Sequence, residues 1–586
     1  MYLNCHSYYS LRYGTLPVEK LVDEAVRCGV QALALTDINN STGIMEFIQV
    51  CTDKGVKPIA GIEFRRDDEL LYAGLARNNE GFRELNEFLS HHNLRNQALP
   101  DRPEQMENVY WIHPFGNSEE RRAMSDENKK PNRSSLIANR SSLVTHRSSL
   151  PGHFIGILPA DMNRLVLSRN RHLMDRMVIF SPVTLLDEKS YELHRNFRAV
   201  DKNVLLSRLQ PGQAASPDEV MMPVDELLEP YREFPGIIRN TEKILEDCSI
   251  GFDFRECKNR RSFTGNIYDD HVLLEKLALD GLQYRYGKGN TEALNRIRHE
   301  LGIISRMGFA AYFLIAWDII RYSMSRGFYH VGRGSGANSI VAYCLKITDV
   351  DPIDLDLYFE RFINPKRTSP PDFDIDYSWK ERDEVLDYIF KRYGHEHTAL
   401  LGAMSTFRDR SIYRELGKVH GLPKQEIDLF IKHPEDAIHK NHIIKKISEL
   451  GEMMADFPNM RTIHAGGVLV SEQPINCYTA LDMPPKGFPT TQWDMYVAED
   501  IGFEKLDILS QRGIGHIYET AGIVRKNKGV SVDVHKINEF KVDEEVKKLL
   551  RVGKTIGCFY VESPAMRGLL KKLHCDNYRS LVAATA

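Results

Sequence analysis

The chain has 586 residues, too many for one hydrophobic core, so we expect several domains. Its 42% hydrophobic and 27% charged content is that of an ordinary folded protein, and its net charge of −4 excludes a broadly basic surface. The nine cysteines contain no CxxC pair, the start MYLNCHSYYS lacks the pattern of a signal peptide, and no apolar run is long enough to span a bilayer. We therefore predict a cytoplasmic protein with reduced thiols and no membrane partner.

The first part of the chain has an α/β pattern. Pro17 precedes an amphipathic helical segment, and a buried strand is predicted over residues 32–37. A second helical segment and the strand VKPIAGIEF repeat the unit, which predicts a parallel sheet or barrel. Asp37 and Glu63 fall at predicted strand ends, where α/β folds build their sites.

Residues 117–150 interrupt this pattern. The motif RSSL begins at Arg133, Arg140 and Arg147, among Asn, Ser and Lys residues. One apolar position in seven cannot form a coiled-coil seam, so we predict a flexible polar insertion. The α/β pattern resumes at HFIGIL and continues to about Phe254.

Beyond Cys257 the pattern changes. Helical and aromatic segments lead to a glycine-rich loop and then to the acidic strand PPDFDIDY. Its aspartates, Asp372, Asp374 and Asp376, alternate with large apolar residues and would share one face of a strand. The alternatives for these carboxylates are a solvated edge or a bound cation. Residues 404–460 are mostly helical and charged, and AGGVLVS and a second acidic strand near Asp507 follow.

The glycine-rich loop lies in HVGRGSGANSIVAYCLK. Glycines let the backbone approach a ligand, and the helix that follows is expected to present free N–H groups to an anion. Ser335 adds a hydroxyl and Arg333 a cation, which together suit a phosphate. The alternative is a tight turn before a buried helix.

Cations accompany both acidic strands. Arg361, Lys366 and Arg367 precede the first strand, and Lys505 precedes Asp507 in GFEKLDILS. Surface salt bridges are one interpretation. Phosphoryl transfer is the other, because it needs cations held by carboxylates together with donors for phosphate oxygens.

A family resemblance rests first on VGRGSGANSIVAYCLKITDVDPIDLDLYFERFINPKRTSPPDFDIDY, which resembles the palm of the bacterial C-family replicative polymerase, the DNA polymerase III α subunit. Further pieces agree in order: LNCHSYYSLRYG, ALTD, HAGGVLVS, KLDILS and GCFYVESPAMRGLL. The resemblance covers nearly the whole chain except the RSSL insertion. It implies that a primer 3′-hydroxyl attacks the α-phosphate of a deoxynucleotide and releases pyrophosphate.

The resemblance also implies roles for residues. The catalytic aspartates that would hold two Mg²⁺ ions are Asp372, Asp374 and Asp507, whereas Asp376 belongs to the motif without being a ligand. The residues that would bind the triphosphate are Arg333, Gly334, Ser335, Gly336, Arg361, Arg367 and Lys505.

The N-terminal part resembles the family's PHP domain, a distorted β/α barrel that acts as a 3′–5′ exonuclease in metal-binding members. His6, Asp37 and Glu63 match metal ligands of that domain. Five other positions do not match: Asn4, Ile38, Leu71, Pro182 and Thr184. Three remaining ligands cannot hold a cluster of two or three ions, so we predict a structural barrel without nuclease activity.

The predicted fold is multidomain, α/β and α+β: a PHP barrel, a polymerase β-like nucleotidyltransferase palm, a helical thumb and the start of the fingers. The predicted boundaries are 1–257 for the PHP domain, 258–403 and 475–512 for the palm, 404–474 for the thumb and 513–586 for the fingers. The chain stops at YRSLVAATA without a helix cap, and the family continues further. We therefore expect a truncated chain that polymerises poorly alone.

The resemblance implies primer–template DNA and deoxynucleoside triphosphates as substrates, and a sliding clamp and other replisome or mutasome subunits as partners through regions beyond residue 586. Two roles stay open, the main replicative polymerase and the error-prone polymerase of damage-induced mutagenesis. A PHP phosphoesterase and a non-catalytic scaffold are alternatives of other classes.

Overall fold

The computed structural model describes residues 1–115, 151–167, 169–363, 373–433 and 442–585. The predicted RSSL insertion lies outside the described residues, as do Lys366, Arg367 and Asp372. The chain forms two compact units. The first comprises Met1–Glu256, Ala399–His464 and Pro474–Ile501, and the second comprises Cys257–Thr398, Ala465–Gln473 and Gly502–Ala586.

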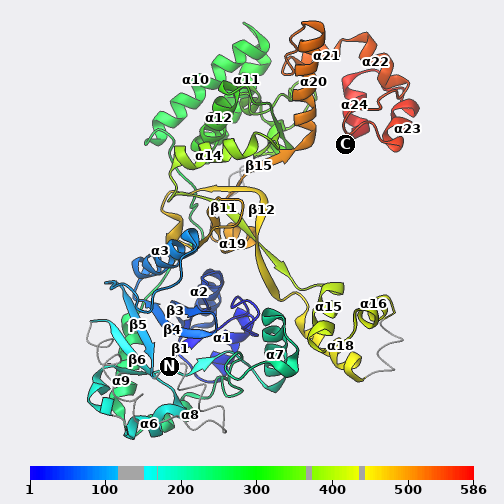
Figure 1. Cartoon of the computed structure of the whole chain (residues 1–586). Helices are drawn as coiled ribbons and strands as arrows, with labels where there is room; N and C mark the ends of the chain where they lie inside the picture. The colour runs from blue at the N-terminus through cyan, green and yellow to red at the C-terminus, as the bar shows by residue number, and fades with distance from the viewer. Residues whose placement is uncertain (116–150, 168, 364–372, 434–441, 586) are drawn as a thin grey trace. The chain divides into compact units, whose positions relative to one another are not determined.

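The first unit contains a curled sheet of eight strands in the order β7-β6-β5-β4-β3-β2-β1-β8 (Figure 1). The strands are β1 (Tyr2–Cys5), β2 (Ala32–Leu35), β3 (Lys57–Arg66), β4 (Glu69–Ala76), β5 (Val109–Pro114), β6 (His153–Ile157), β7 (Met177–Ile179) and β8 (Pro182–Val183). Most neighbours are parallel, and only β3–β4 and β4–β5 are antiparallel. The prediction of a distorted β/α barrel is confirmed.

Helices connect and cover these strands. They are α1 (Val18–Arg27), α2 (Ile44–Lys54), α3 (Asn79–Arg95), α6 (Met162–Leu167), α7 (Glu188–Lys202), α8 (Val224–Leu228) and α9 (Pro235–Asp247). The sequence pattern explains the first of them: α1 begins after Pro17 and buries Leu21, Val22 and Ala25 on one face. Its strand β2, ALAL, is then buried almost completely, as expected for a parallel strand covered by helices.

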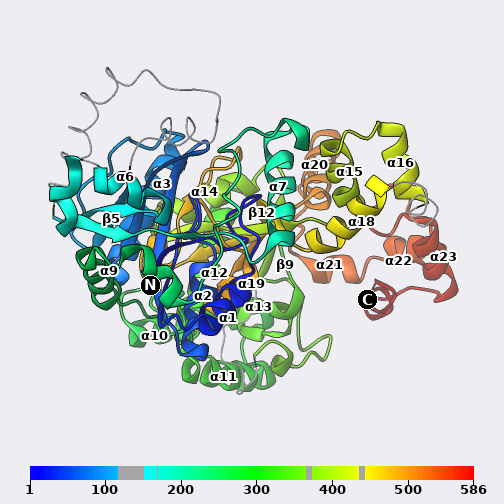
Figure 2. The ribbon, with the colours of Figure 1, turned by 90° about the horizontal axis from the view of Figure 1, so that it is seen from below.

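Three further helices of the first unit share a hydrophobic core with α7: α15 (Asp409–Val419), α16 (Lys424–Lys432) and α18 (His442–Met454). Phe197 of α7 stacks on Phe407, and Leu416 and Ile447 are fully buried beside them. The helices α7, α15 and α18 lie side by side in both views (Figures 1 and 2). The remaining elements are β11 (Thr398–Thr406), β12 (Pro458–Val470), β13 (Leu481–Asp482), β14 (Thr490–Thr491) and α19 (Met495–Asp500).

The second unit is built on β9 (His330–Arg333), β10 (Asp374–Ser378) and β15 (Leu506–Gln511). β10 is parallel to β15 and antiparallel to β9, and residues 467–468 of β12 pair with β15 on the far side. Along β10 the apolar residues Ile375 and Tyr377 are fully buried as predicted, but Asp376 is buried as well, and only Asp374 at the start of the strand is partly exposed.

The described part of the second unit also contains helices. They are α10 (Ile267–Tyr286), α11 (Thr291–Arg306), α12 (Ala310–Ser325), α13 (Ile340–Cys344) and α14 (Arg382–Tyr393), followed after β15 by α20 (Arg512–Lys528), α21 (Ile537–Lys541), α22 (Glu544–Arg551), α23 (Pro564–Lys572) and α24 (Tyr578–Thr585). In the described ranges no single helix is long and apolar enough to cross a membrane. Only α11 and α12 together reach that length and hydropathy, as a pair bent by 115°.

Candidate active site

Strand register brings two of the predicted catalytic aspartates together. Asp374 of β10 is the direct partner of Asp507 on the parallel strand β15, and Arg333 of β9 is its partner on the other side. Neighbouring strands lie about 4.8 Å apart, and side chains at paired positions point to the same face of a sheet. The two carboxylates, distant in sequence, therefore share one face of the second unit's sheet. We call Asp374, Asp507 and the residues that contact them the palm site.

Each of these carboxylates has a cation beside it. Nζ of Lys505 lies 3.0 Å from Oδ2 of Asp507, and the guanidinium Nη1 of Arg333 lies 3.4 Å from Oδ2 of Asp374. The Arg333 side chain is 47% exposed, so water screens its ion pair. The arrangement joins hard oxygen ligands of the kind that Mg²⁺ prefers to cations that could bind phosphate.

The glycine-rich loop lies directly against Asp374. Residues Gly334–Asn338 form a 3₁₀ turn after β9, and Gly334 has a φ of +71°, in the region that favours glycine. A Cβ atom added at Gly334 would lie 2.7 Å from Oδ2 of Asp374. Glycine at this position therefore lets the loop backbone approach the carboxylate. The side-chain amide of Asn338 donates to the carbonyl of Ser335 at 2.8 Å and braces the turn from within.

Asp376 is held internally. Only 2% of the residue is exposed, and its Oδ2 accepts hydrogen bonds from Nε of Arg333 at 3.0 Å and from the amide of Gln511 at 3.1 Å. Burial raises the pKa of Asp376, and Arg333 and Gln511 oppose that shift. A solvated edge is therefore not the environment of this aspartate, and its partners give it a structural role beside the paired carboxylates.

Sequence reasoning missed two residues that tie the strands of the palm site together. The hydroxyl of Tyr312 donates to the carbonyl of Lys505 at 3.2 Å and accepts from the backbone N–H of Phe373 at 3.2 Å. The buried guanidinium of Arg382 donates to the carbonyls of Ile508 and Ala465. The aromatic segment that contains Tyr312 was visible in the sequence, but nothing in it indicated a bridge between two distant strands.

The helix after the glycine loop corrects one expectation. We expected α13 to present free N–H groups to a phosphate, but its first N–H groups already have acceptors. Those of Ile340 and Val341 donate to the two carboxylate oxygens of Glu300, at 3.1 and 3.2 Å, and that of Ala342 donates to Oγ of Ser339 at 3.1 Å. A buried carboxylate from α11 therefore occupies this helix end, and an anion at the site must bind elsewhere on the loop.

The other predicted site residues are less closely placed. Arg361 is the last residue of a short 3₁₀ turn, Phe359–Arg361, and it is exposed to solvent. Asp372 and Arg367 lie outside the described residues, so their roles stay predictions. Among the residues that the structure describes, no three His, Cys, Asp or Glu side chains come together as a metal site.

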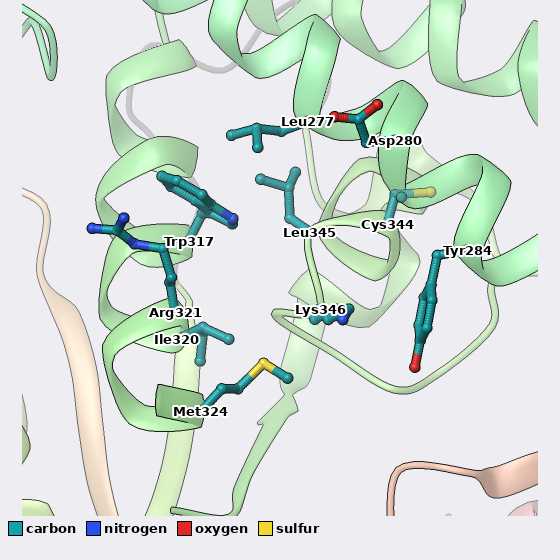
Figure 3. A pocket seen from close by; sticks show the side chains of 11 residues that line it. Leu277, Asp280, Tyr284, Trp317, Ile320, Arg321, Met324, Cys344, Leu345 and Lys346 are labelled. Carbon is teal, nitrogen blue, oxygen red and sulfur yellow. The ribbon is translucent and has the colours of Figure 1, made fainter. Parts of the chain in front are cut away.

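A cavity of about 410 Å³ in the second unit is separate from the palm site (Figure 3). Apolar side chains of α10 and α12 and of the segment after α13 form its walls, with Trp317 and Leu345 among them. Arg321 and Lys346 stand over the rings of Trp317 and Tyr284 at its edge. Neither aspartate of the palm site lines this cavity.

The first unit holds a second carboxylate cluster, which we call the barrel site. Glu63 of β3 is fully buried, and its Oε2 lies 2.8 Å from the amide nitrogen of Asn4 and 3.2 Å from Nε2 of His6. Its Oε1 pairs with Nε of Arg65, whose guanidinium lies 4.4 Å from the centre of the Tyr13 ring. Burial alone would raise the pKa of Glu63, but Arg65 and His6 lower it to about 2.

Asp37 and His6 have internal partners as well. Asp37 accepts hydrogen bonds from the hydroxyls of Ser7 and Ser10, both at 2.6 Å, and burial raises its pKa against them. Nδ1 of His6 lies 2.9 Å from the hydroxyl of Thr184. The three residues that match metal ligands thus bond to neighbouring side chains, and a guanidinium supplies positive charge at Glu63.

Comparison with known proteins agrees with this arrangement. Residues 272–510 match the bacterial DNA polymerase III alpha NTPase domain, residues 3–126 the PHP domain, and residues 514–586 the bacterial DNA polymerase III alpha subunit finger domain. The whole chain aligns with an error-prone DNA polymerase of Symbiobacterium thermophilum (29% identical, 57% of the relative's length). It also aligns over its whole length with DNA polymerase III subunits alpha of Bacillus subtilis (29%, 55%) and Escherichia coli (27%, 54%).

The curled sheet of the first unit and the pairing of Asp374 with Asp507 agree with the class inferred from the sequence, a C-family DNA polymerase. Models of the bacterial DNA polymerase III alpha NTPase domain, the PHP domain and the finger domain match successive parts of the chain, and the family resemblance inferred from the sequence is confirmed. The chain spans about half the length of the curated relatives it matches.

Proposed function

We propose that this chain carries the nucleotidyl-transfer site of a template-directed DNA polymerase. The observation that supports this most strongly is the register that places Asp374 beside Asp507, with the glycine loop against Asp374. Primer–template DNA and deoxynucleoside triphosphates are the proposed substrates. A sliding clamp, other replisome or mutasome subunits and a cytoplasmic location stay predictions from the family resemblance.

In this proposal Asp374 and Asp507, together with Asp372, hold two Mg²⁺ ions. When bound, the ions would stabilise charge on the attacking and leaving oxygens. The residues of the chain do the positioning. The loop that begins at Gly334 lies against Asp374, and the half-exposed Arg333 can exchange its carboxylate partner for a phosphate oxygen because its ion pair lies near water. Lys505 and Asp507 are only 12% and 11% exposed, so a phosphate contact by Lys505 stays a prediction from the family resemblance.

For the barrel we propose a structural role without nuclease activity. The ion pair of Glu63 with Arg65 supports it, because a guanidinium beside the carboxylate competes with a metal ion for the same oxygens. A PHP phosphoesterase remains the alternative, and stoichiometric zinc or manganese in the purified chain would favour it. The replicative and error-prone roles stay open, since relatives with either name are equally similar at 29% identity.

The test is incorporation of one nucleotide into a primer–template by excess protein in a single turnover. Asp374→Asn and Asp507→Asn are each expected to slow incorporation by about 10²–10³-fold or more, because each removes an anionic ligand of the Mg²⁺ ions that would stabilise the transition state. Asp387→Asn is the matched control, since Asp387 lies on α14 and pairs with the exposed Lys391. A measurable rate in the parent that both Asp→Asn variants leave unchanged would refute the polymerase and favour a scaffold.

A further inference from the structure

Side chains from one turn of α11 form hydrogen bonds with residues 338–341, which follow the glycine loop. Glu300 of α11 is fully buried, and its carboxylate accepts from the hydroxyl of Ser339 at 2.8 Å in addition to the N–H groups of Ile340 and Val341. Burial raises the pKa of Glu300 to about 7 against these bonds. Burying a carboxylate costs free energy because it loses its hydration. We therefore expect the hydrogen bonds of Glu300 to have a specific structural role.

Arg296, one turn earlier on α11, holds the end of the loop itself. Its Nη2 donates to the carbonyl of Asn338 at 2.9 Å, and its Nε lies 3.3 Å from Oε1 of Glu300. The carbonyl of Asn338 and the N–H of Ile340 are thus bound by two side chains that also contact each other. Since Asn338 in turn braces Ser335, this clamp extends to the middle of the glycine loop.

The other end of α13 is fixed in a complementary way. The guanidinium of Arg285 on α10 donates to the carbonyls of Tyr343 and Thr348, at 3.1 and 3.2 Å, and its side chain is 8% exposed. At Gly281 the same helix packs so closely that a Cβ atom would lie 2.2 Å from the carbonyl oxygen of Cys344. An acid at the N-terminus and a base at the C-terminus both match the helix dipole. The segment behind the loop therefore has little freedom to move.

We propose that Glu300, together with Arg296, is a positioning residue for the incoming nucleotide. By occupying the N-terminus of α13, Glu300 directs the triphosphate to the loop at Gly334–Gly336, and by holding Ser339–Val341 it fixes that loop beside Asp374. This inference rests on the proposed function, because it takes the loop to be the triphosphate site. The clamp should therefore affect binding of a triphosphate more than binding of a monophosphate or of DNA.

The experiment measures equilibrium binding of Mg-dGTP, dGMP and a primer–template duplex to the whole chain and its variants. Glu300→Ala is expected to weaken Mg-dGTP binding by about tenfold, the equivalent of one lost hydrogen bond to a charged group, with dGMP and duplex binding unchanged. Ser339→Ala removes the bond to Glu300 and the bond from the N–H of Ala342 but keeps the carboxylate, so about threefold is expected. Glu292→Gln, at an exposed position in the first turn of α11, is the matched control.

Thermal unfolding of each variant shows whether it is folded, and Ser339→Ala carries the test if Glu300→Ala does not fold. Unchanged or tighter Mg-dGTP binding in the folded variants would overturn the inference, as would an equal loss for triphosphate and duplex. Incorporation by Asp374→Asn in the same preparations tests the proposed function separately, since an unchanged rate there would refute that function alone. A parent chain that binds no Mg-dGTP would overturn both.

Discussion

The barrel site and the palm site both bring carboxylates and cations together, but the paired side chains differ in how far they are exposed to solvent. At the barrel site Glu63 is fully buried and Arg65 is 14% exposed. The side chains of Asn4 and His6 also contact the Glu63 carboxylate. At the palm site the Lys505–Asp507 pair is nearly as buried, at 12% and 11%, but Asp374 is 23% exposed and its partner Arg333 is 47% exposed. A buried ion pair cannot release its cation without a large cost, whereas an exposed pair can exchange partners. The Glu63–Arg65 pair of the barrel site is thus fixed, whereas the Asp374–Arg333 pair of the palm site can exchange partners.

The largest effect is expected from Arg65→Ala. The substitution leaves the Glu63 carboxylate buried without its cation, so we expect a loss of about 3–5 kcal/mol in the free energy of unfolding. Urea unfolding followed by tryptophan fluorescence measures it, because Trp111 is buried in the barrel.

Arg66→Ala serves as the control on the same strand, since the Arg66 side chain is 40% exposed and pairs with the exposed Asp101. A second arm is Glu63→Gln combined with Arg65→Ala, which should recover part of the loss because it removes the unpaired charge. If Arg65→Ala were as mild as Arg66→Ala, the barrel site would not depend on its internal cation.

An intermediate and pH-dependent effect is expected at His535. Its Nδ1 lies 2.6 Å from Oδ2 of Asp349, and this hydrogen bond raises the pKa of His535 above its ordinary value of 6.5. A raised histidine pKa in the folded state means that the pair stabilises fully below about pH 6.5 and that this contribution is lost as the pH rises through the folded-state pKa. His535→Gln should therefore destabilise by about 0.5–1 kcal/mol near pH 5.5 and by less near pH 9.

Thermal unfolding of the parent and the variant at both pH values checks this. His516→Gln, at an exposed position on α20, controls for the general effect of losing a histidine. A pH-independent difference between His535→Gln and the parent would show that packing, rather than the charge of His535, fixes this segment.

A smaller effect on stability than at Arg65 is expected at Arg333. Its guanidinium is about half exposed, and the amide of Gln511 still donates to the buried Asp376 when Arg333 is removed, so Arg333→Ala should lower the free energy of unfolding by about 1 kcal/mol, less than Arg65→Ala. Binding of Mg-dGTP should weaken more than stability does, since Arg333 is a proposed phosphate ligand. The same urea and binding assays measure both, and a loss of stability as large as that of Arg65→Ala would remove the distinction between the two sites.

The sequence alone predicted most of the residues of the palm site, but not the contacts that hold those residues in place. Alternation of Asp374 and Asp376 with buried apolar residues predicted a strand with one acidic face, and that local pattern needs no tertiary information. The pairing of Asp374 with Asp507 depends on the register of two strands far apart in the chain, so spacing alone could not establish it.

The helix end at Ile340 shows the limit of local reasoning most clearly. A glycine loop before a helix indicates an anion site, but whether the helix end is open depends on a neighbour from another helix, here Glu300. At the barrel site the ion pair is visible in the sequence, because Arg65 lies two positions after Glu63 on the same strand and alternate residues share a face. Tertiary packing, rather than local propensity, determines which side chain lies at the helix end or beside the buried carboxylate.

The most direct test of the account is a double-mutant cycle on Mn²⁺ binding, measured by electron paramagnetic resonance with Mg²⁺ omitted and dGTP present. If Asp374 and Asp507 share an ion, each Asp→Asn variant weakens Mn²⁺ binding strongly and the double variant is hardly weaker than either one. Additive losses in the double variant, or no loss in either single variant, would contradict a shared metal site at the centre of the palm.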